Sequence, residues 1–109
     1  MNHTVRVLLC LCAVLVAAEA RSQSAAQIFR DADLALGQQL IQQHRCNDCH
    51  IKKVGGAGFS IYRPAGRINT PGFLRGMVEQ CNTELNLSLF PDEVSSIAAV
   101  LNRDHYRFK

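Results

Sequence analysis

The sequence predicts an all-α protein, and three observations support this class. Three segments, residues 31–44, 70–81 and 91–102, carry apolar residues three or four positions apart, and each begins with a helix-start signal. No segment shows the alternation of apolar and polar residues that is typical of a half-buried strand. No internal repeat or low-complexity segment interrupts this pattern. We therefore expect about three helices and no sheet.

The N-terminus has the composition of an export signal. A positive charge near the start precedes an apolar run over residues 5–16, which is too short and wrongly flanked to be a good membrane span. Ala18-Glu19-Ala20 matches a signal-peptidase site, so residues 1–20 are predicted to be removed. An uncleaved anchor, or lipidation of Cys10 or Cys12, is the alternative that would place the protein on a membrane. We expect a periplasmic or otherwise exported protein.

Length and charge limit what the mature chain can be. Removal of residues 1–20 from the 109-residue chain leaves 89 residues, enough for one small domain. We divide these into a loosely ordered lead-in, residues 21–30, and a single domain, residues 31–109. The net charge is +3, and the basic residues are scattered without interleaved aromatic side chains. This pattern argues against nucleic acid as a partner.

The first helix of the domain is expected to start at Asp31 or Asp33 and to end near His44. Its apolar positions include Leu36, Leu40 and Ile41. Gly37 lies within this segment, where glycine costs helix stability relative to alanine. A glycine at this position is explained if another helix crosses there and requires close approach of the backbones.

The most informative motif follows this helix, at Cys46-Asn47-Asp48-Cys49-His50. C-x-x-C-H is the attachment site of a c-type haem. Two thiols at this spacing reach the vinyl groups on one edge of a porphyrin, and the next histidine lies under the ring and binds the iron. A zinc site would need a second ligand pair at finger-like spacing, and only Cys81, His44 and His105 remain to supply it. A thioredoxin-like site should follow a strand, whereas a helix is predicted here.

A glycine-rich loop separates the motif from the second helix. Arg63 and Arg67 flank Pro64 in the last part of this loop. Either arginine can bind a haem propionate through a bidentate contact, and the alternative is that both are solvated loop charges. We expect Phe59 and Tyr62 to pack on the ring.

The second and third helices have clear starts. Thr70 and Pro71 form a cap and first turn for a helix that reaches about Cys81. Pro91-Asp92-Glu93 begins the third helix, which ends near Asn102 and whose apolar positions are Val94, Ile97, Ala98 and Leu101. We assign Phe73 and Phe90 to the helical core, and we assign no element to the tail.

The motif and the order of helices resemble the class I cytochrome c domain of bacteria, over roughly residues 34–101. The strong element is the CNDCH motif, and Gly37-Gln-Gln-Leu-Ile41 and Pro91-Asp-Glu-Val94 support it. The resemblance implies that the first and last helices cross at the glycine and that the helices wrap one covalently attached haem. It also implies that the carbonyl of Pro64 accepts the proximal imidazole N–H; stiffening of a turn is the alternative role.

The distal iron ligand departs from the family pattern. The family takes a methionine from the loop before the last helix, whereas Met77, the single methionine of the mature chain, lies on a predicted helix. Met77 is our candidate ligand because a thioether favours the reduced iron, and a core-filling role is the alternative. Cys81, one turn later, is the competing ligand; a thiolate would lower the reduction potential. Its other reading is a buried, inert thiol.

A second, partial resemblance concerns the high-spin cytochromes related to cytochrome c″. It rests on Arg67-Ile-Asn-Thr70 and on Cys81-Asn82. In that group the distal ligand immediately precedes the cysteine, and the cysteine forms a disulfide a few residues on. Here Gln80 occupies the ligand position, and no cysteine follows Cys81. This resemblance implies an iron that is open to small ligands.

Two functional hypotheses follow from these observations. The first is electron transfer between redox proteins through one haem c, without catalysis. The second is an open-site haem protein that binds a diatomic gas or reduces peroxide. Catalysis would need a distal acid–base group, and the sequence places no histidine or arginine there clearly.

Overall fold

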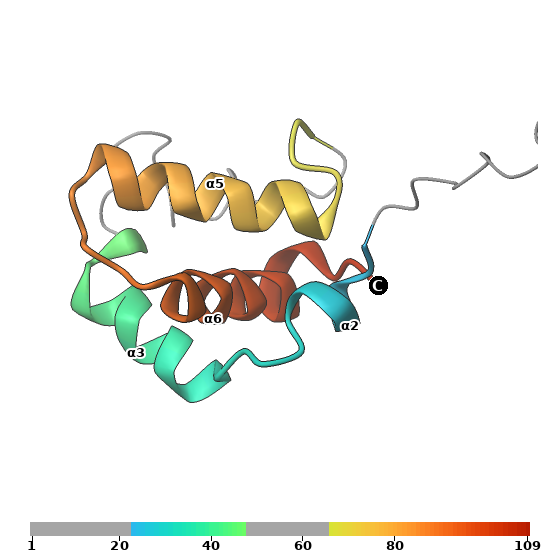
Figure 1. Cartoon of the computed structure of the whole chain (residues 1–109), viewed down its shortest axis with the longest axis horizontal. Helices are drawn as coiled ribbons and strands as arrows, with labels where there is room; N and C mark the ends of the chain where they lie inside the picture. Colours follow the sequence, from blue (N-terminus) through green and yellow to red (C-terminus); the bar gives the residue numbers. More distant parts are fainter. Residues whose placement is uncertain (1–22, 48–65) are drawn as a thin grey trace, which may run out of the picture.

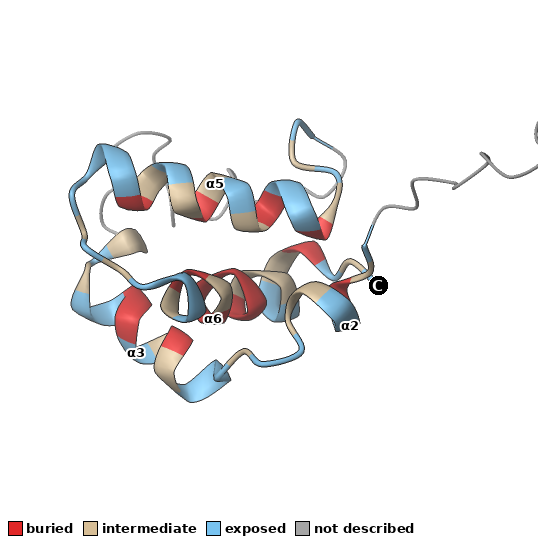
Figure 2. Ribbon diagram, in the orientation of Figure 1, coloured by how far each residue is buried: buried red, intermediate tan, exposed pale blue. Residues whose placement is uncertain are grey.

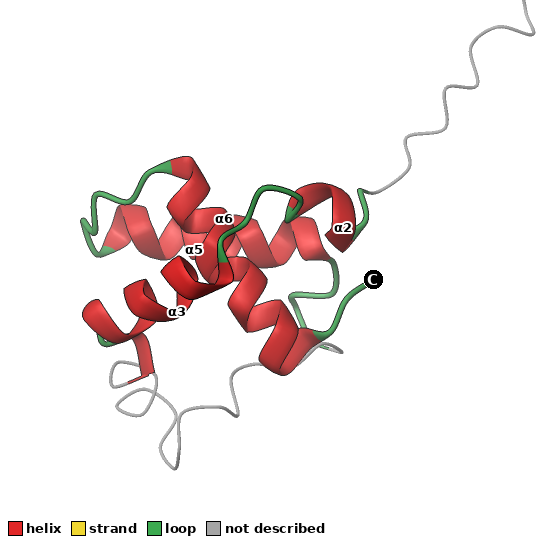
Figure 3. Cartoon of the chain, turned by 90° about the horizontal axis from the view of Figure 1, so that it is seen from below, coloured by secondary structure: helices red, strands yellow, loops and turns green. Residues whose placement is uncertain are grey.

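The computed structural model of the chain describes residues 23–47 and 66–109. These two stretches contain the helices α2 (Ala25–Ile28), α3 (Leu34–Gln43), α5 (Pro71–Glu84) and α6 (Pro91–Leu101), followed by a π-helical turn, η3 (Asn102–Tyr106). No strand occurs in the described stretches, as Figure 3 shows. The predicted all-α class is confirmed for this part of the chain.

Short-range hydrogen bonds fix the starts of the three longer helices. The Asp33 carboxylate accepts from the Leu36 N–H at 2.9 Å, and the Thr70 hydroxyl accepts from the Phe73 N–H at 3.1 Å. At α6, the Glu93 carboxylate accepts from the Phe90 N–H at 2.8 Å. The predicted starts are therefore confirmed. Helix α5 ends at Glu84, about one turn beyond the predicted end.

Helix α6 is the central element. Helix α3 packs on one side of it, and α5 runs antiparallel to it on the other side (Figure 1). Because two helices cover α6, its burial extends beyond the predicted apolar face and also takes in Ser96, Ala99 and Val100. Figure 2 shows that the buried residues of α5 lie on the side that faces α6.

Helices α3 and α6 cross at Gly37. A Cβ atom added to Gly37 would overlap the Ser96 carbonyl and would lie 2.9 Å from Val100 Cγ2. The Ser96 hydroxyl also accepts from the Asp33 N–H at 3.0 Å, while it donates to the Asp92 carbonyl at 2.8 Å. The close approach that Gly37 predicted is confirmed, and Ser96 fixes the start of α3 against α6.

The lead-in is partly helical, so the expectation of a loosely ordered segment is wrong for residues 25–28. Ser24 and Gln27 form a capping box, with the Gln27 N–H donating to the Ser24 hydroxyl and the Ser24 N–H donating to the Gln27 side chain. The Ala25 N–H then donates to the Lys109 carbonyl at 3.2 Å. The two ends of the domain therefore hold each other, which local sequence patterns do not reveal.

Asn102 and two aromatic rings order the C-terminal tail. The Asn102 side chain donates to the Phe108 carbonyl at 3.1 Å and accepts from the Phe108 N–H at 2.8 Å. Tyr106 is buried and stacks on Phe108 with a centroid separation of 5.5 Å. Over the described stretches, no helix combines the length and hydropathy that a membrane crossing needs.

Candidate haem-attachment site

The predicted haem motif begins just after helix α3. The helix ends at Gln43, and the chain turns through His44 and through Arg45, whose φ of 52° is left-handed. Cys46 follows this turn, is half-buried and packs against the hydrophobic core. The end of α3 thus places the first of the two predicted thioether residues beside the core.

Several predicted site residues lie outside the described part of the chain. These are Cys49 and His50 of the motif, Arg63 and Pro64 of the following loop, and the aromatic residues Phe59 and Tyr62. Their predicted roles remain predictions. Arg67 is described and exposed in the segment that precedes α5.

The two candidate distal ligands lie side by side on α5. Met77 and Cys81 are one helical turn apart, so both side chains project from the same face of the helix. Both are half-buried. Neither belongs to the core cluster that the described residues form, although their neighbours Leu74 and Val78 do.

Phe73 extends this row of side chains by another turn, and it is 63% exposed. The prediction that Phe73 serves the helical core is wrong, because α5 faces α6 with Leu74, Val78 and Asn82 instead. The prediction for Phe90 is also wrong, since its side chain is 69% exposed just before α6. We call Phe73, Met77 and Cys81 the α5 strip.

The α5 strip has the chemistry that a haem face requires. It is apolar along three turns, and it contains a thioether and a thiol, two of the side chains that bind haem iron. It borders the face of α5 that packs on α6 and lies outside the core cluster of the described residues. The described residues therefore offer a thiol at Cys46 and an apolar strip with two candidate iron ligands on α5, which are side chains that a covalently bound haem would need.

The two described histidines outside the motif have other surroundings. His44 caps the end of α3, where its backbone N–H donates to the Leu40 carbonyl at 3.0 Å. His105 lies in η3, where burial lowers its pKa and the negative charge of Asp104 opposes this change. In the stretches that the structure covers, no three His, Cys, Asp or Glu side chains gather where a metal ion could bind.

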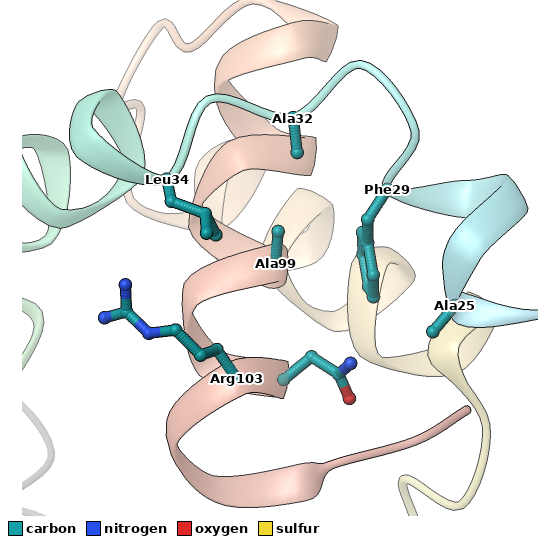
Figure 4. Close-up of a pocket in the computed structure, with 7 residues that line it drawn as sticks. Ala25, Phe29, Ala32, Leu34, Ala99 and Arg103 are labelled. Carbon is teal, nitrogen blue, oxygen red and sulfur yellow. The ribbon is translucent and has the colours of Figure 1, made fainter.

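A separate shallow pocket of about 300 Å³ lies between α2, the segment before α3 and the end of α6 (Figure 4). Its wall is mostly apolar, with Phe29 and Leu34 as the largest apolar contributors. Arg103, at its edge, donates to both Asp104 carboxylate oxygens and to the Gln38 side chain. Asn102 is held by the Phe108 backbone. Both polar side chains of the pocket are thus engaged in holding the fold.

Comparisons with known proteins add no relative: no protein-family model, no curated protein and no solved structure matches the chain.

Proposed function

We propose that this chain is a small exported class I c-type cytochrome that transfers electrons through one covalently bound haem c. The observation that carries the proposal is the intact C-x-x-C-H motif at residues 46–50, placed directly after a helix. The crossing of α3 and α6 at Gly37 supports it, because the same crossing is expected from the family resemblance. An exported protein would meet its haem outside the cytoplasm, as this attachment chemistry requires.

In this proposal, each predicted site residue has a role in binding the haem. Cys46 and Cys49 hold the haem through thioethers, His50 binds the iron and Met77 completes its coordination. The bound group supplies a one-electron iron couple. The chain covers the ring with the apolar α5 strip, which keeps water from the iron. Arg63, Pro64 and Arg67 position the propionates and the proximal imidazole.

Rigid packing suits this function. The three longer helices share one core, and within the described residues every buried side-chain nitrogen or oxygen has a hydrogen-bond partner. A protein that changes little between two oxidation states transfers electrons with a small reorganisation cost. Redox proteins are then the donor and the acceptor.

Covalent attachment is the first test. The full chain is produced together with a cytochrome maturation system, denatured, separated on a gel and stained for haem peroxidase activity. We expect stain at the mass of the mature protein, and we expect its loss in the Cys46→Ser/Cys49→Ser variant. Cys81→Ser is the matched control, since it removes a cysteine outside the motif and should keep the stain. An unstained wild-type protein under these conditions would end the proposal.

A further inference from the structure

The connection between α5 and α6 displays large apolar side chains to solvent. Leu85 is 54% exposed and Phe90 is 69% exposed, at the two ends of this connection. Neither side chain packs against the core cluster of the described residues, whereas Leu89, the residue before Phe90, does. Exposed apolar side chains that lie together on a surface are typical of docking sites, whereas single ones are ordinary.

Asn82 brings the backbone at the two ends of this connection together. Its side chain accepts from the Leu89 N–H at 2.9 Å and donates to the Leu89 carbonyl at 3.2 Å, and its own carbonyl accepts from the Leu87 N–H at 3.0 Å. The residue before Phe90 is therefore held against the last turn of α5, which ends next to Leu85. No local sequence pattern marks Asn82 for this role, because only the folded connection brings the two ends together.

The connection is also held in one shape. Asn86 and Ser88 both adopt left-handed backbone conformations, with φ of 52° and 58°. With the Asn82 hydrogen bonds, this geometry presents Leu85 and Phe90 from a fixed backbone. A surface that is already ordered loses less conformational entropy when a partner binds.

The segment that carries this apolar pair is acidic. Between Gly76 and Asn102 the sequence has four acidic residues, Glu79, Glu84, Asp92 and Glu93, and no lysine or arginine, although the whole chain carries a net charge of +3. Arg75 reaches the same region, where it donates to the Pro91 carbonyl and to Ser95. Within residues 75–101, four carboxylates against the Arg75 guanidinium leave a net charge of −3. We call this set, with Leu85 and Phe90, the acidic end surface.

Helix stability explains only part of this charge. Asp92 and Glu93 lie in the first turn of α6, where negative charge is favourable. Glu84 lies in the last turn of α5, where negative charge opposes the helix dipole, and it is exposed. The Glu84 carboxylate accepts from the Gln80 side chain at 2.9 Å, which offsets part of this cost, but helix stability does not require all four carboxylates.

We propose that the acidic end surface docks a protein partner whose own surface has an apolar spot surrounded by lysines or arginines. Charge complementarity selects this partner over an anionic membrane or a nucleic acid, both of which the carboxylates repel. Figures 1 and 3 both place the connection at the same end of the molecule as the end of α3, from which the haem motif continues. This docking partner would be the redox partner of the proposed electron carrier, so the inference rests on the proposed function.

The test measures binding by calorimetry with the haem-loaded full-length protein. The probe is a lysine-rich mitochondrial cytochrome c, and the matched probe is the same protein with its lysines succinylated. We expect binding to the lysine-rich form at low salt, loss of binding near 0.5 M salt because of screening, and none to the succinylated form. Equal binding of both probes, or of neither, overturns the proposal.

Variants locate the contact. Leu85→Ser/Phe90→Ser should weaken binding at least tenfold, and serine at position 90 is a favourable helix cap, so the fold is kept. Glu84→Gln/Asp92→Asn should weaken binding and flatten its salt dependence without removing any apolar side chain. Leu34→Ser is the control, because Leu34 is 41% exposed but lines the separate pocket. An equal effect of Leu34→Ser overturns the proposal.

A second copy of this chain is the competing occupant, because Arg103, Arg107 and Lys109 make its C-terminal end basic. Sedimentation of the protein without any probe tests this case. Self-association that Phe90→Ser abolishes would show that a second copy occupies the surface, and it would overturn the proposal of a basic partner. The calorimetric result is also separable from the proposed function. If a protein without haem binds the probe, the docking surface is retained and the electron-transfer function is rejected. If the haem-loaded protein does not bind the probe, the docking surface is rejected and the electron-transfer function is retained.

Discussion

At the scale of single residues, the absence of a side chain at Gly37 sets how closely α3 and α6 approach. A Cβ atom there would overlap the Ser96 carbonyl, which is part of a helix backbone and cannot rotate away. Gly37→Ala should therefore lower the free energy of unfolding by about 1–3 kcal/mol through overpacking, although alanine is the better helix former. Chemical denaturation of the holoprotein measures this change.

Gly76→Ala provides the matched control for this prediction. Gly76 also lies within a helix, but nothing would lie within 4 Å of an added Cβ atom. The same substitution should there raise the free energy of unfolding by up to about 1 kcal/mol. If both variants were stabilised, the crossing at Gly37 would be looser than the structure indicates.

Met77 and Cys81 differ in what they would do to a haem iron. A thioether keeps the iron low-spin in both oxidation states and raises its potential, whereas a thiolate lowers the potential. Met77→Ala should make the reduced protein high-spin, open it to carbon monoxide and lower its potential. Cys81→Ala should leave the absorption spectrum nearly unchanged.

The reverse result would identify a different protein. A spectral change only in Cys81→Ala would indicate thiolate ligation. Unchanged spectra in both variants, with rapid carbon monoxide binding by the wild type, would favour the open-site hypothesis over electron transfer.

At the scale of elements, the sequence predicts what local chemistry decides. Asp33 and Thr70 accept hydrogen bonds from residues three positions away, and Pro71 acts through its fixed φ angle, so the starts of α3 and α5 were predictable. Helix α2 was missed although Ser24 and Gln27 match a local capping box, whereas the Ala25–Lys109 hydrogen bond joins residues far apart in the sequence and has no local signal. Phe73 was misassigned because periodicity identifies an apolar face without saying which side of it packs on α6.

The π-helical turn η3 gives the protein a pH dependence. Burial lowers the pKa of His105 below its ordinary value of 6.5, so the folded protein takes up this proton less readily than the unfolded chain. The contribution of His105 to the free energy of unfolding is fully present above the ordinary pKa. It decreases as the pH falls from there towards the lower pKa of the folded state. Asp104 acts at more acidic pH, because hydrogen bonding by Arg103 lowers the pKa of its carboxyl group.

Thermal unfolding between about pH 7.5 and pH 5.5 tests this dependence. We expect the midpoint to fall with pH in the wild type and to fall less in His105→Gln, which cannot gain the charge. His44→Gln is the control, because His44 caps a different helix. An identical slope in His105→Gln and the wild type would exclude His105 as the origin.

At the scale of the whole molecule, the described helices form one small core around α6. Among the described residues, the largest fully buried side chains are Leu74, Val94, Val100 and Ser96. The α5 strip and Phe90 add apolar surface that this core does not cover. The C-x-x-C-H motif is visible in the sequence and predicts the attachment of a large apolar group. Which helix surface remains uncovered for that group depends on how α5 is rotated against α6, and local patterns do not determine this rotation.

We therefore predict that the chain depends on its haem to fold. The 89 residues that removal of the predicted signal would leave bury too little apolar area to offset their conformational entropy comfortably, and covering the α5 strip with a porphyrin would bury more. Cys46→Ser/Cys49→Ser should abolish cooperative thermal unfolding followed by far-ultraviolet circular dichroism, while the holoprotein shows a single sharp transition. A sharp transition in this variant close to the holoprotein midpoint would show that α3, α5 and α6 are self-sufficient. The exposed Phe73 would then need another explanation than a covering haem, and a protein partner at the α5 strip would be the next hypothesis to test.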